Sequence, residues 1–287
     1  MPAEGPDAAE PCYRFAVAPR FSMPGAFDGR LERNGGVHQD GDRVWPLADW
    51  RVLPATEVTS LVTGVSGRDA ILPPTHLGLL KVPDHLRAGW WAEAERSGGV
   101  TPAAGAHFEG IFSKVVDFLR FKRLPLPEQV TLKVAVSVPG LSSTRVASAG
   151  GPPGLSFGDA ADTAEAGGGQ PVACINFGDE GAYLVLLELP PATMAARLEG
   201  AGVALPQGLA PAALVRRYFE AFPRQPLLRL RLEPGEGLWL SPLGVVHDGW
   251  TDGKLDLDVM LLVGCQTPSL RRSTSPTGQE TGVPDGA

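Results

Sequence analysis

Five histidines and the carboxylates near them are the side chains of this chain that could hold a metal ion. His247 closes the string Pro242-Leu-Gly-Val-Val-His247, which lies between two apolar runs near the C-terminal end. Neutral imidazole is a good ligand for divalent metal ions such as iron. His247 is therefore the first candidate site residue. The alternative is an exposed residue of the turn VVHDGWTDG.

The residues around His247 carry a resemblance to a known superfamily. A glycine-bearing turn (PGEG, 234–237), a short strand and the P-x-G-x-x-H string resemble the second conserved motif of cupins, and more broadly the distal-histidine strand of double-stranded β-helix proteins. That superfamily includes the non-haem iron, 2-oxoglutarate-dependent oxygenases. The resemblance covers residues 233–263 closely and the strands from 171 onward loosely. It implies a barrel with Fe(II) at its mouth, His247 as one ligand, and 2-oxoglutarate as a co-substrate.

The further metal ligands that the resemblance implies are not found where they are expected. His38-Gln39-Asp40 spells an H-x-D motif but lies 209 residues before His247. Asp159 and Asp179 lie in the region where the first motif belongs, which contains no histidine. Three interpretations stay open: His247 with unusual carboxylate partners, a remote histidine brought in by the fold, or a barrel without a metal.

Two rows of charged residues could bind a substrate. In many members of the superfamily an arginine 10 or 11 residues beyond the distal histidine binds 2-oxoglutarate, but here Leu257 and Asp258 occupy those positions. Arg229 and Arg231 alternate with leucines, so both lie on one face of a strand. If this face and the face of Asp258 point inward, they form a polar site with His247. If they point outward, they form ordinary cross-strand ion pairs.

Two tryptophans flank the His247 turn. Trp239 and Trp250 could stack on a substrate ring near a barrel mouth, although a large aromatic side chain is more often simply packed in a core. We therefore treat both as candidate substrate-binding residues.

The elements that would position these residues are mostly strands. Residues 13–100 read as largely irregular. Beyond them the hydrophobic periods predict a mainly β, α+β fold, in the form of a double-stranded β-helix (jelly-roll or cupin-like) barrel with a few flanking helices. The predicted strands are 13–17, 51–53, 131–138, 171–178, 182–189, 227–233, 237–242, 244–248 and 255–263, and the predicted helices are 86–97, 104–123 and 211–222.

Amino-acid composition limits the fold classes and the domain organisation that the chain can have. The 36 glycines and 28 prolines among 287 residues exclude a helical bundle, because both residues are poor in helix interiors. We expect disordered ends at 1–12 and 266–287, a single domain at 13–265, and a flexible insert at 139–171 that acts as a lid.

Net charge and cysteine content limit the kinds of partner and the cellular compartment that we expect for this chain. A net charge of −7 gives no general attraction to nucleic acid or to an anionic membrane. Three widely spaced cysteines indicate no disulfide framework, and no signal peptide or long apolar run is found. We expect a cytoplasmic protein that acts on a small molecule, and a homodimer is compatible with the sequence.

Two functions follow. The first is a bacterial non-haem iron oxygenase of specialised metabolism that acts on a small polar or aromatic metabolite, with use of 2-oxoglutarate left open. The second is a metal-free cupin-like isomerase or small-molecule-binding barrel.

Overall fold

The computed structural model describes residues 14–17, 27–41, 43–62, 76–99, 108–124, 126, 130–144, 154–155, 172–240 and 245–265. The predicted ends 1–12 and 266–287 and most of the predicted insert 139–171 lie outside these residues. Within them the chain is mainly β, with five helices and three sheets, which confirms the α+β class.

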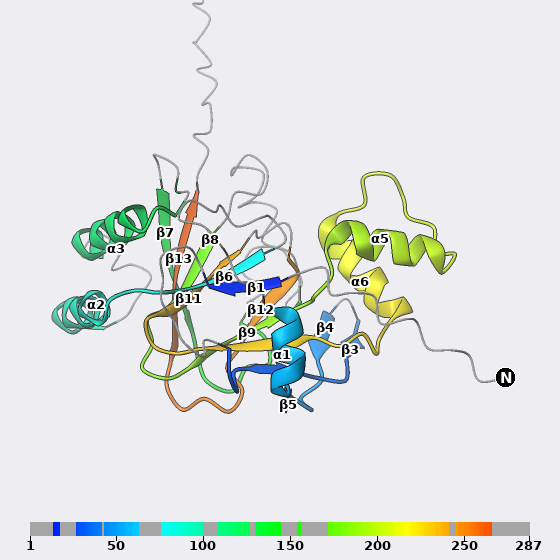
Figure 1. Ribbon diagram of the computed structural model, residues 1–287, viewed down its shortest axis with the longest axis horizontal. Helices are drawn as coiled ribbons and strands as arrows, with labels where there is room; N and C mark the ends of the chain where they lie inside the picture. The colour runs from blue at the N-terminus through cyan, green and yellow to red at the C-terminus, as the bar shows by residue number, and fades with distance from the viewer. Residues whose placement is uncertain are drawn as a thin grey trace, which may run out of the picture.

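Two sheets form the centre of the molecule (Figure 1). The large sheet has six strands, in the order β1 (Arg14–Val17), β6 (His76–Lys81), β11 (Glu236–Leu240), β8 (Val172–Asn176), β13 (Asp258–Cys265) and β7 (Val130–Ser137). The small sheet has five strands, in the order β12 (His247–Trp250), β9 (Ala182–Leu186), β10 (Leu228–Leu232), β2 (Leu31–Arg33) and β5 (Arg51–Val52). All neighbours are antiparallel except β1 and β6, which are parallel.

A layer of leucines lies between the two sheets. Leu79 and Leu238 of the large sheet belong to the same buried cluster as Leu184, Leu186 and Leu230 of the small sheet. Because side chains alternate along a strand, these residues define the inward face of each sheet. Every residue two positions away from them along a regular strand points inward as well.

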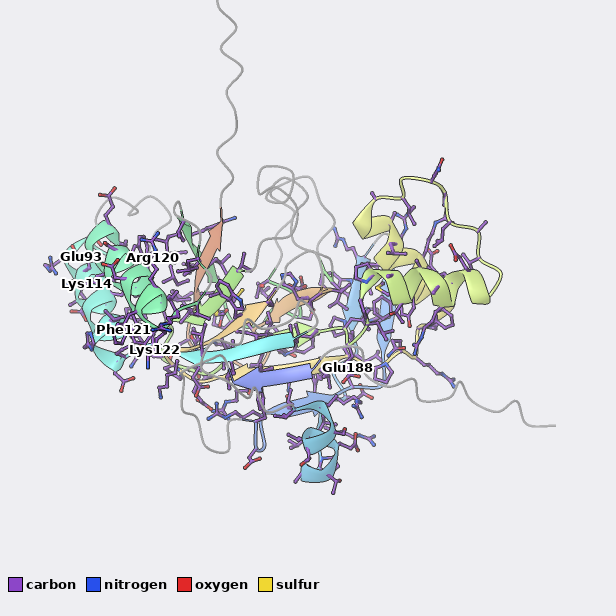
Figure 2. All side chains as sticks on the ribbon, turned by 45° about the horizontal axis from the view of Figure 1, so that its top comes forward. Glu93, Lys114, Arg120, Phe121, Lys122 and Glu188 are labelled. Atoms are coloured by element: carbon purple, nitrogen blue, oxygen red, sulfur yellow. The ribbon has the colours of Figure 1, made fainter. Side chains whose placement is uncertain are left out.

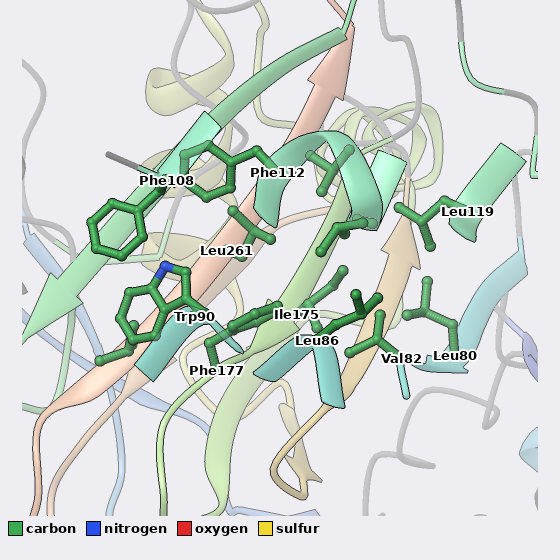
Figure 3. Close-up of a cluster of buried hydrophobic side chains, with 14 of the residues drawn as sticks. Leu80, Val82, Leu86, Trp90, Phe108, Phe112, Leu119, Ile175, Phe177 and Leu261 are labelled. Atoms are coloured by element: carbon green, nitrogen blue, oxygen red, sulfur yellow. The ribbon is translucent and has the colours of Figure 1, made fainter. Parts of the chain in front are cut away.

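Helices α2 (Asp84–Arg96) and α3 (Glu109–Phe121) cover the outer face of the large sheet (Figure 3). In α3 the 3.6-residue period brings Phe112, Val115 and Leu119 onto the buried side. Trp90 of α2 stacks on Phe108 at a centroid distance of 5.2 Å. The second core of the molecule therefore lies between these helices and the large sheet.

The outer face of the small sheet is covered by α5 (Pro191–Gly200), α6 (Pro211–Ala221) and a hairpin of β3 (Val37–Asp40) and β4 (Arg43–Pro46). Val185 of β9 packs there with Tyr218 and Phe219 of α6. The layers of the molecule are thus helices, large sheet, small sheet, and a mixed layer of helices and hairpin.

The strands predicted from 131 to 263 and the three predicted helices are confirmed, with ends shifted by a few residues. The prediction of largely irregular structure at 13–100 is wrong, because this region contributes β2, β3, β4, α1 (Ala55–Leu61) and β6. Helix α5 was not predicted. No helix in the described parts of the chain is long and apolar enough to cross a membrane.

Candidate functional site

His247 is the first residue of β12 and lies on the inward face of the small sheet, directly opposite Leu186 of β9. Its side chain is half-buried. The Nδ1 atom lies 2.8 Å from the carbonyl oxygen of Val245. Because a carbonyl oxygen can only accept a hydrogen bond, Nδ1 carries the proton in the neutral ring and the lone pair lies on Nε2. The ring is thus held in the tautomer that can accept a proton or bind a metal ion through Nε2.

A carboxylate reaches the same end of the inward face from the neighbouring strand. The Leu187 N–H donates to the Val246 carbonyl oxygen at 3.0 Å, which extends the pairing of β9 and β12 beyond Leu186. Glu188 therefore lies on the inward face, two residues after Leu186. It is the diagonal neighbour of His247 on the adjacent strand, and the Cα atoms of such neighbours are typically about 7–8 Å apart. In Figure 2 Glu188 lies far from the labelled residues of α2 and α3.

An arginine completes this group. The register runs from Leu186 to Leu228 and on to Arg33, so Arg33 lies in the same row of the sheet as His247. Its Nη2 is 3.5 Å from Oε1 of Glu188, and its Nη1 pairs with Glu57 of α1. We call the four residues His247, Glu188, Arg33 and Glu57 the inward cluster.

Glu188 is the buried carboxyl group of the inward cluster. Its side chain is only 16% exposed, and burial raises the pKa of Glu188, while the nearby Arg33 opposes this rise. Within the described residues Oε1 accepts no hydrogen bond, although Arg33 Nη2 lies 3.5 Å away. The inward cluster therefore places a carboxyl group whose pKa is raised by burial on the same face as an imidazole.

Three residues of the inward cluster, Glu188, Arg33 and Glu57, were not among the candidates predicted from the sequence. Glu188 could have been found from its position, because this single charged residue of the predicted strand 182–189 lies two and four residues after Leu186 and Leu184, on the same face. Arg33 and Glu57 could not have been found in this way, because neither β2 nor α1 was predicted.

The other residues proposed as metal ligands do not join His247. Asp179 is exposed in the turn between β8 and β9, and Arg87 Nη1 lies 2.6 Å from its Oδ1. His38 and Asp40 are exposed on β3, on the opposite side of the small sheet from His247. Asp159 lies outside the described residues.

Residues 140–144 run beside the part of β12 that follows His247, from Asp248 to Thr251. The Thr144 N–H donates to the Gly249 carbonyl oxygen at 3.1 Å, and the Thr251 N–H donates to the Leu141 carbonyl oxygen at 2.8 Å. A partner strand in this position could bring further ligands to His247, but its described residues are Gly140, Leu141, two serines and Thr144.

Asp248 fixes this segment against β12. Its Oδ2 accepts a hydrogen bond from Ser143 Oγ at 2.5 Å, and its Oδ1 accepts one from the Gly249 N–H at 2.7 Å. Position 249 needs a glycine, since a Cβ there would collide with the Thr144 side chain.

An Fe(II) site held by three protein ligands does not fit the part of the chain that the structure describes. Among those residues no three histidine, cysteine, aspartate or glutamate side chains come together to hold a metal ion.

The candidate substrate-binding arginines lie on the outer face of the small sheet. Arg229 Nε is 2.5 Å from Glu32 Oε2, and the guanidinium lies 4.5 Å from the ring centroid of Tyr183, 4.7 Å from that of Trp50 and 5.6 Å from that of Trp250. Such cation–π contacts stabilise the packing between the sheet and its outer layer. Arg231 is half-exposed and pairs with Glu233.

The remaining candidates lie elsewhere again. Trp239 is buried between the large sheet and α2, and Trp250 packs edge-on against Trp50. Asp258 points inward but lies at the far end of the sheets, because β12 runs away from His247 and the turn 251–257 then leads into β13. There it pairs with Lys254 Nζ at 2.6 Å. The structure therefore does not bring the arginines, tryptophans and Asp258 together with His247.

Comparison of the chain with protein-family models, with curated proteins and with solved structures finds no match.

Proposed function

We propose that the chain is a double-stranded β-helix protein that binds a small, carboxylate-bearing metabolite at the inward cluster and isomerises it by proton transfer without a metal ion. The order of the strands supports this fold. From residue 130 onward the chain passes from β7 to the segment 140–144 beside β12, then to β8, β9, β10, β11, β12 and β13.

The strands that lie side by side in each sheet are those expected for two interleaved Greek-key motifs. The large sheet contains β11, β8, β13 and β7 side by side, and the small sheet contains β10, β9, β12 and the segment 140–144. Eight strands divided in this way between two facing sheets are typical of jelly rolls and cupins. The helices then form outer layers, and the inward face near His247 becomes the mouth of the barrel.

The observation that carries the proposed chemistry is the diagonal placement of His247 and Glu188 on one inward face, beside Arg33. A carboxyl group and an imidazole on one face are groups that can donate and accept the proton in such a transfer. Arg33 supplies a guanidinium that can pair with a substrate carboxylate.

The reaction needs no external oxidant. His247 Nε2 takes a proton from a carbon next to a substrate carbonyl, and Glu188 gives its proton to the carbonyl oxygen, so that an enol forms. Return of a proton to a different face or carbon gives the isomer, and both residues recover their starting states.

Binding is tested by a thermal-shift screen of small mono- and dicarboxylates in the presence of a chelator. We expect at least one compound to raise the melting temperature of the wild-type chain, and we expect His247→Ala and Arg33→Met to abolish the shift. Arg231→Met, on the outer face, is the matched control and should bind normally. A shift that persists in both cluster variants would count against this site.

Catalysis is tested separately with the compound that binds. In D₂O the wild-type chain should exchange one carbon-bound hydrogen of that compound for deuterium, as followed by proton NMR. Glu188→Gln should bind the compound but lose the exchange. Exchange at the wild-type rate in Glu188→Gln would remove the assigned role of this carboxyl group.

A second candidate is the iron-dependent oxygenase. It is favoured by the hydrogen bond from His247 Nδ1 to a backbone carbonyl, which is the usual outer support of a metal-binding histidine. Metal analysis of the purified chain separates the two candidates. About one iron per chain, lost in His247→Ala with the fold intact, would replace our proposal with this one, and turnover of 2-oxoglutarate to succinate would then define its co-substrate.

A further inference from the structure

Strand β7 forms one edge of the large sheet (Figure 1). All eight of its residues pair with β13, from Val130 opposite Cys265 to Ser137 opposite Asp258. Among the described residues no strand pairs with its other side. About half of its N–H and C=O groups therefore point away from the sheet and can pair with a further strand.

This edge has few of the features that usually prevent strands from pairing between molecules. Its sequence, VTLKVAVS, has no proline, no bulge and one charged residue, Lys133. By contrast, β5 at the edge of the small sheet has only two residues, and both are exposed. Short, charged edges are the common protection in monomeric sheets, and β7 lacks this protection.

Exposed apolar side chains gather at the end of the same edge. Val138 follows β7 and Leu257 precedes β13, next to the paired residues Ser137 and Asp258, and the two residues are 56% and 44% exposed. Leu255, nearby in the same turn, is 86% exposed. Of the five large hydrophobic side chains that are exposed in the described residues, three lie at this corner. Such a concentration is typical of an interaction site rather than of scattered surface residues.

We propose that a second copy of the chain pairs antiparallel with β7, so that two large sheets join into one sheet of twelve strands around a twofold axis at Val134. This register is self-complementary. Towards α2 and α3 it places apolar residues opposite apolar residues, with Val134 opposite the Val134 of the second copy, Leu132 opposite Val136 and Val130 opposite Val138. It also places Lys133 opposite Ala135 of the other copy.

Lys133, the one charged residue of β7, favours this register over the two adjacent registers. In an antiparallel pair, residues directly opposite each other point to the same face of the sheet. A register that keeps the same residues on each face can therefore differ from this one only by moving the twofold axis one residue or more along β7. An axis at Lys133 places the two lysines directly opposite each other, which is unfavourable. An axis at Ala135 shortens the paired segment, because Val130 then loses its apolar partner.

Sedimentation velocity over a range of protein concentrations tests the dimer. We expect the full chain to move from monomer to dimer as its concentration rises. Ala135→Lys places a lysine opposite Lys133 at two symmetric positions and should weaken the dimer by about tenfold or more. Ala135→Glu places opposite charges there and should strengthen it.

The double variant Lys133→Glu with Ala135→Lys tests the register itself, because it restores two opposite-charge pairs and should recover the dimer lost in Ala135→Lys. Val52→Lys, on the edge of the small sheet, is the control and should leave the dimer unchanged. Melting temperatures show that each variant is folded. A chain that stays monomeric at every concentration, or a dimer that responds to Val52→Lys but not to Ala135→Lys, would overturn the proposal.

Discussion

Glu188 is a carboxyl group whose charge is unfavourable in the folded chain. Burial is the larger influence on it and raises its pKa above that of an exposed glutamate, as in the unfolded chain. At low pH the group is protonated in both states and has no effect on stability. As the pH rises through the ordinary carboxyl range, the unfolded chain releases this proton more readily than the folded one, so this group lowers the free energy of unfolding.

The Glu188→Gln variant removes this pH dependence. We expect its melting temperature to equal that of the wild-type chain near about pH 3 and to exceed it at neutral pH. Glu199, exposed at the end of α5, provides the control, and Glu199→Gln should show no such trend. A neutral-pH loss of stability in Glu188→Gln would mean that the contact with Arg33 outweighs the burial of Glu188.

Helix α3 ends with a backbone conformation that is unusual for its residue. Arg123 has φ of +56°, in the left-handed region, where the Leu124 N–H reaches back to the Leu119 carbonyl oxygen at 3.1 Å. Glycine is the common residue at this position of a helix end, because a Cβ there costs about 1 kcal/mol.

Arg123→Gly should therefore raise the free energy of unfolding by up to about 1 kcal/mol, measured by urea denaturation. Lys122→Gly is the matched control, since Lys122 has φ of −77° and gains nothing from glycine there. Equal effects of the two substitutions would show that the strain at Arg123 is not what limits this end of the helix.

The elements differ in how far their sequence predicts them. Strands β8, β9 and β13 are buried apolar runs, and helices α3 and α6 have a clear 3.6-residue period, so local pattern was sufficient. Strand β2 has only three residues, which is too short for a period to be visible, whereas β5 lies within the predicted strand 51–53. Arg33 could not be assigned to a site for the same reason, because its strand is defined by pairing with β10, almost two hundred residues away.

The two ends of the molecule carry different polar groups. The inward cluster lies at one end of the leucine layer, and the ion pair of Lys254 with Asp258 lies at the other, with side chains only 2% and 7% exposed. Sequence alternation correctly placed Asp258 on an alternating strand, but the end of the two sheets at which it lies follows from chain direction, which periodicity does not give.

Removing one member of this pair should destabilise the whole domain. Asp258→Ala leaves a buried ammonium group without its partner and should lower the free energy of unfolding by about 3–5 kcal/mol. Lys254→Met combined with Asp258→Leu should recover most of that loss, because no buried charge then remains. Asp256→Ala, at a nearby exposed position, should change little in the same urea experiment.

The position of Cys174 gives the protein an internal reporter. Cys174 lies in β8 between Leu238 of β11 and Leu262 of β13, and burial raises the pKa of its thiol to about 12. An alkylating reagent reacts with the thiolate, so Cys174 should be modified only in molecules whose central strands have separated. Its alkylation rate under native conditions, followed by peptide mass spectrometry, therefore measures how often the large sheet opens, and that rate should fall as protein concentration rises if two copies share the sheet.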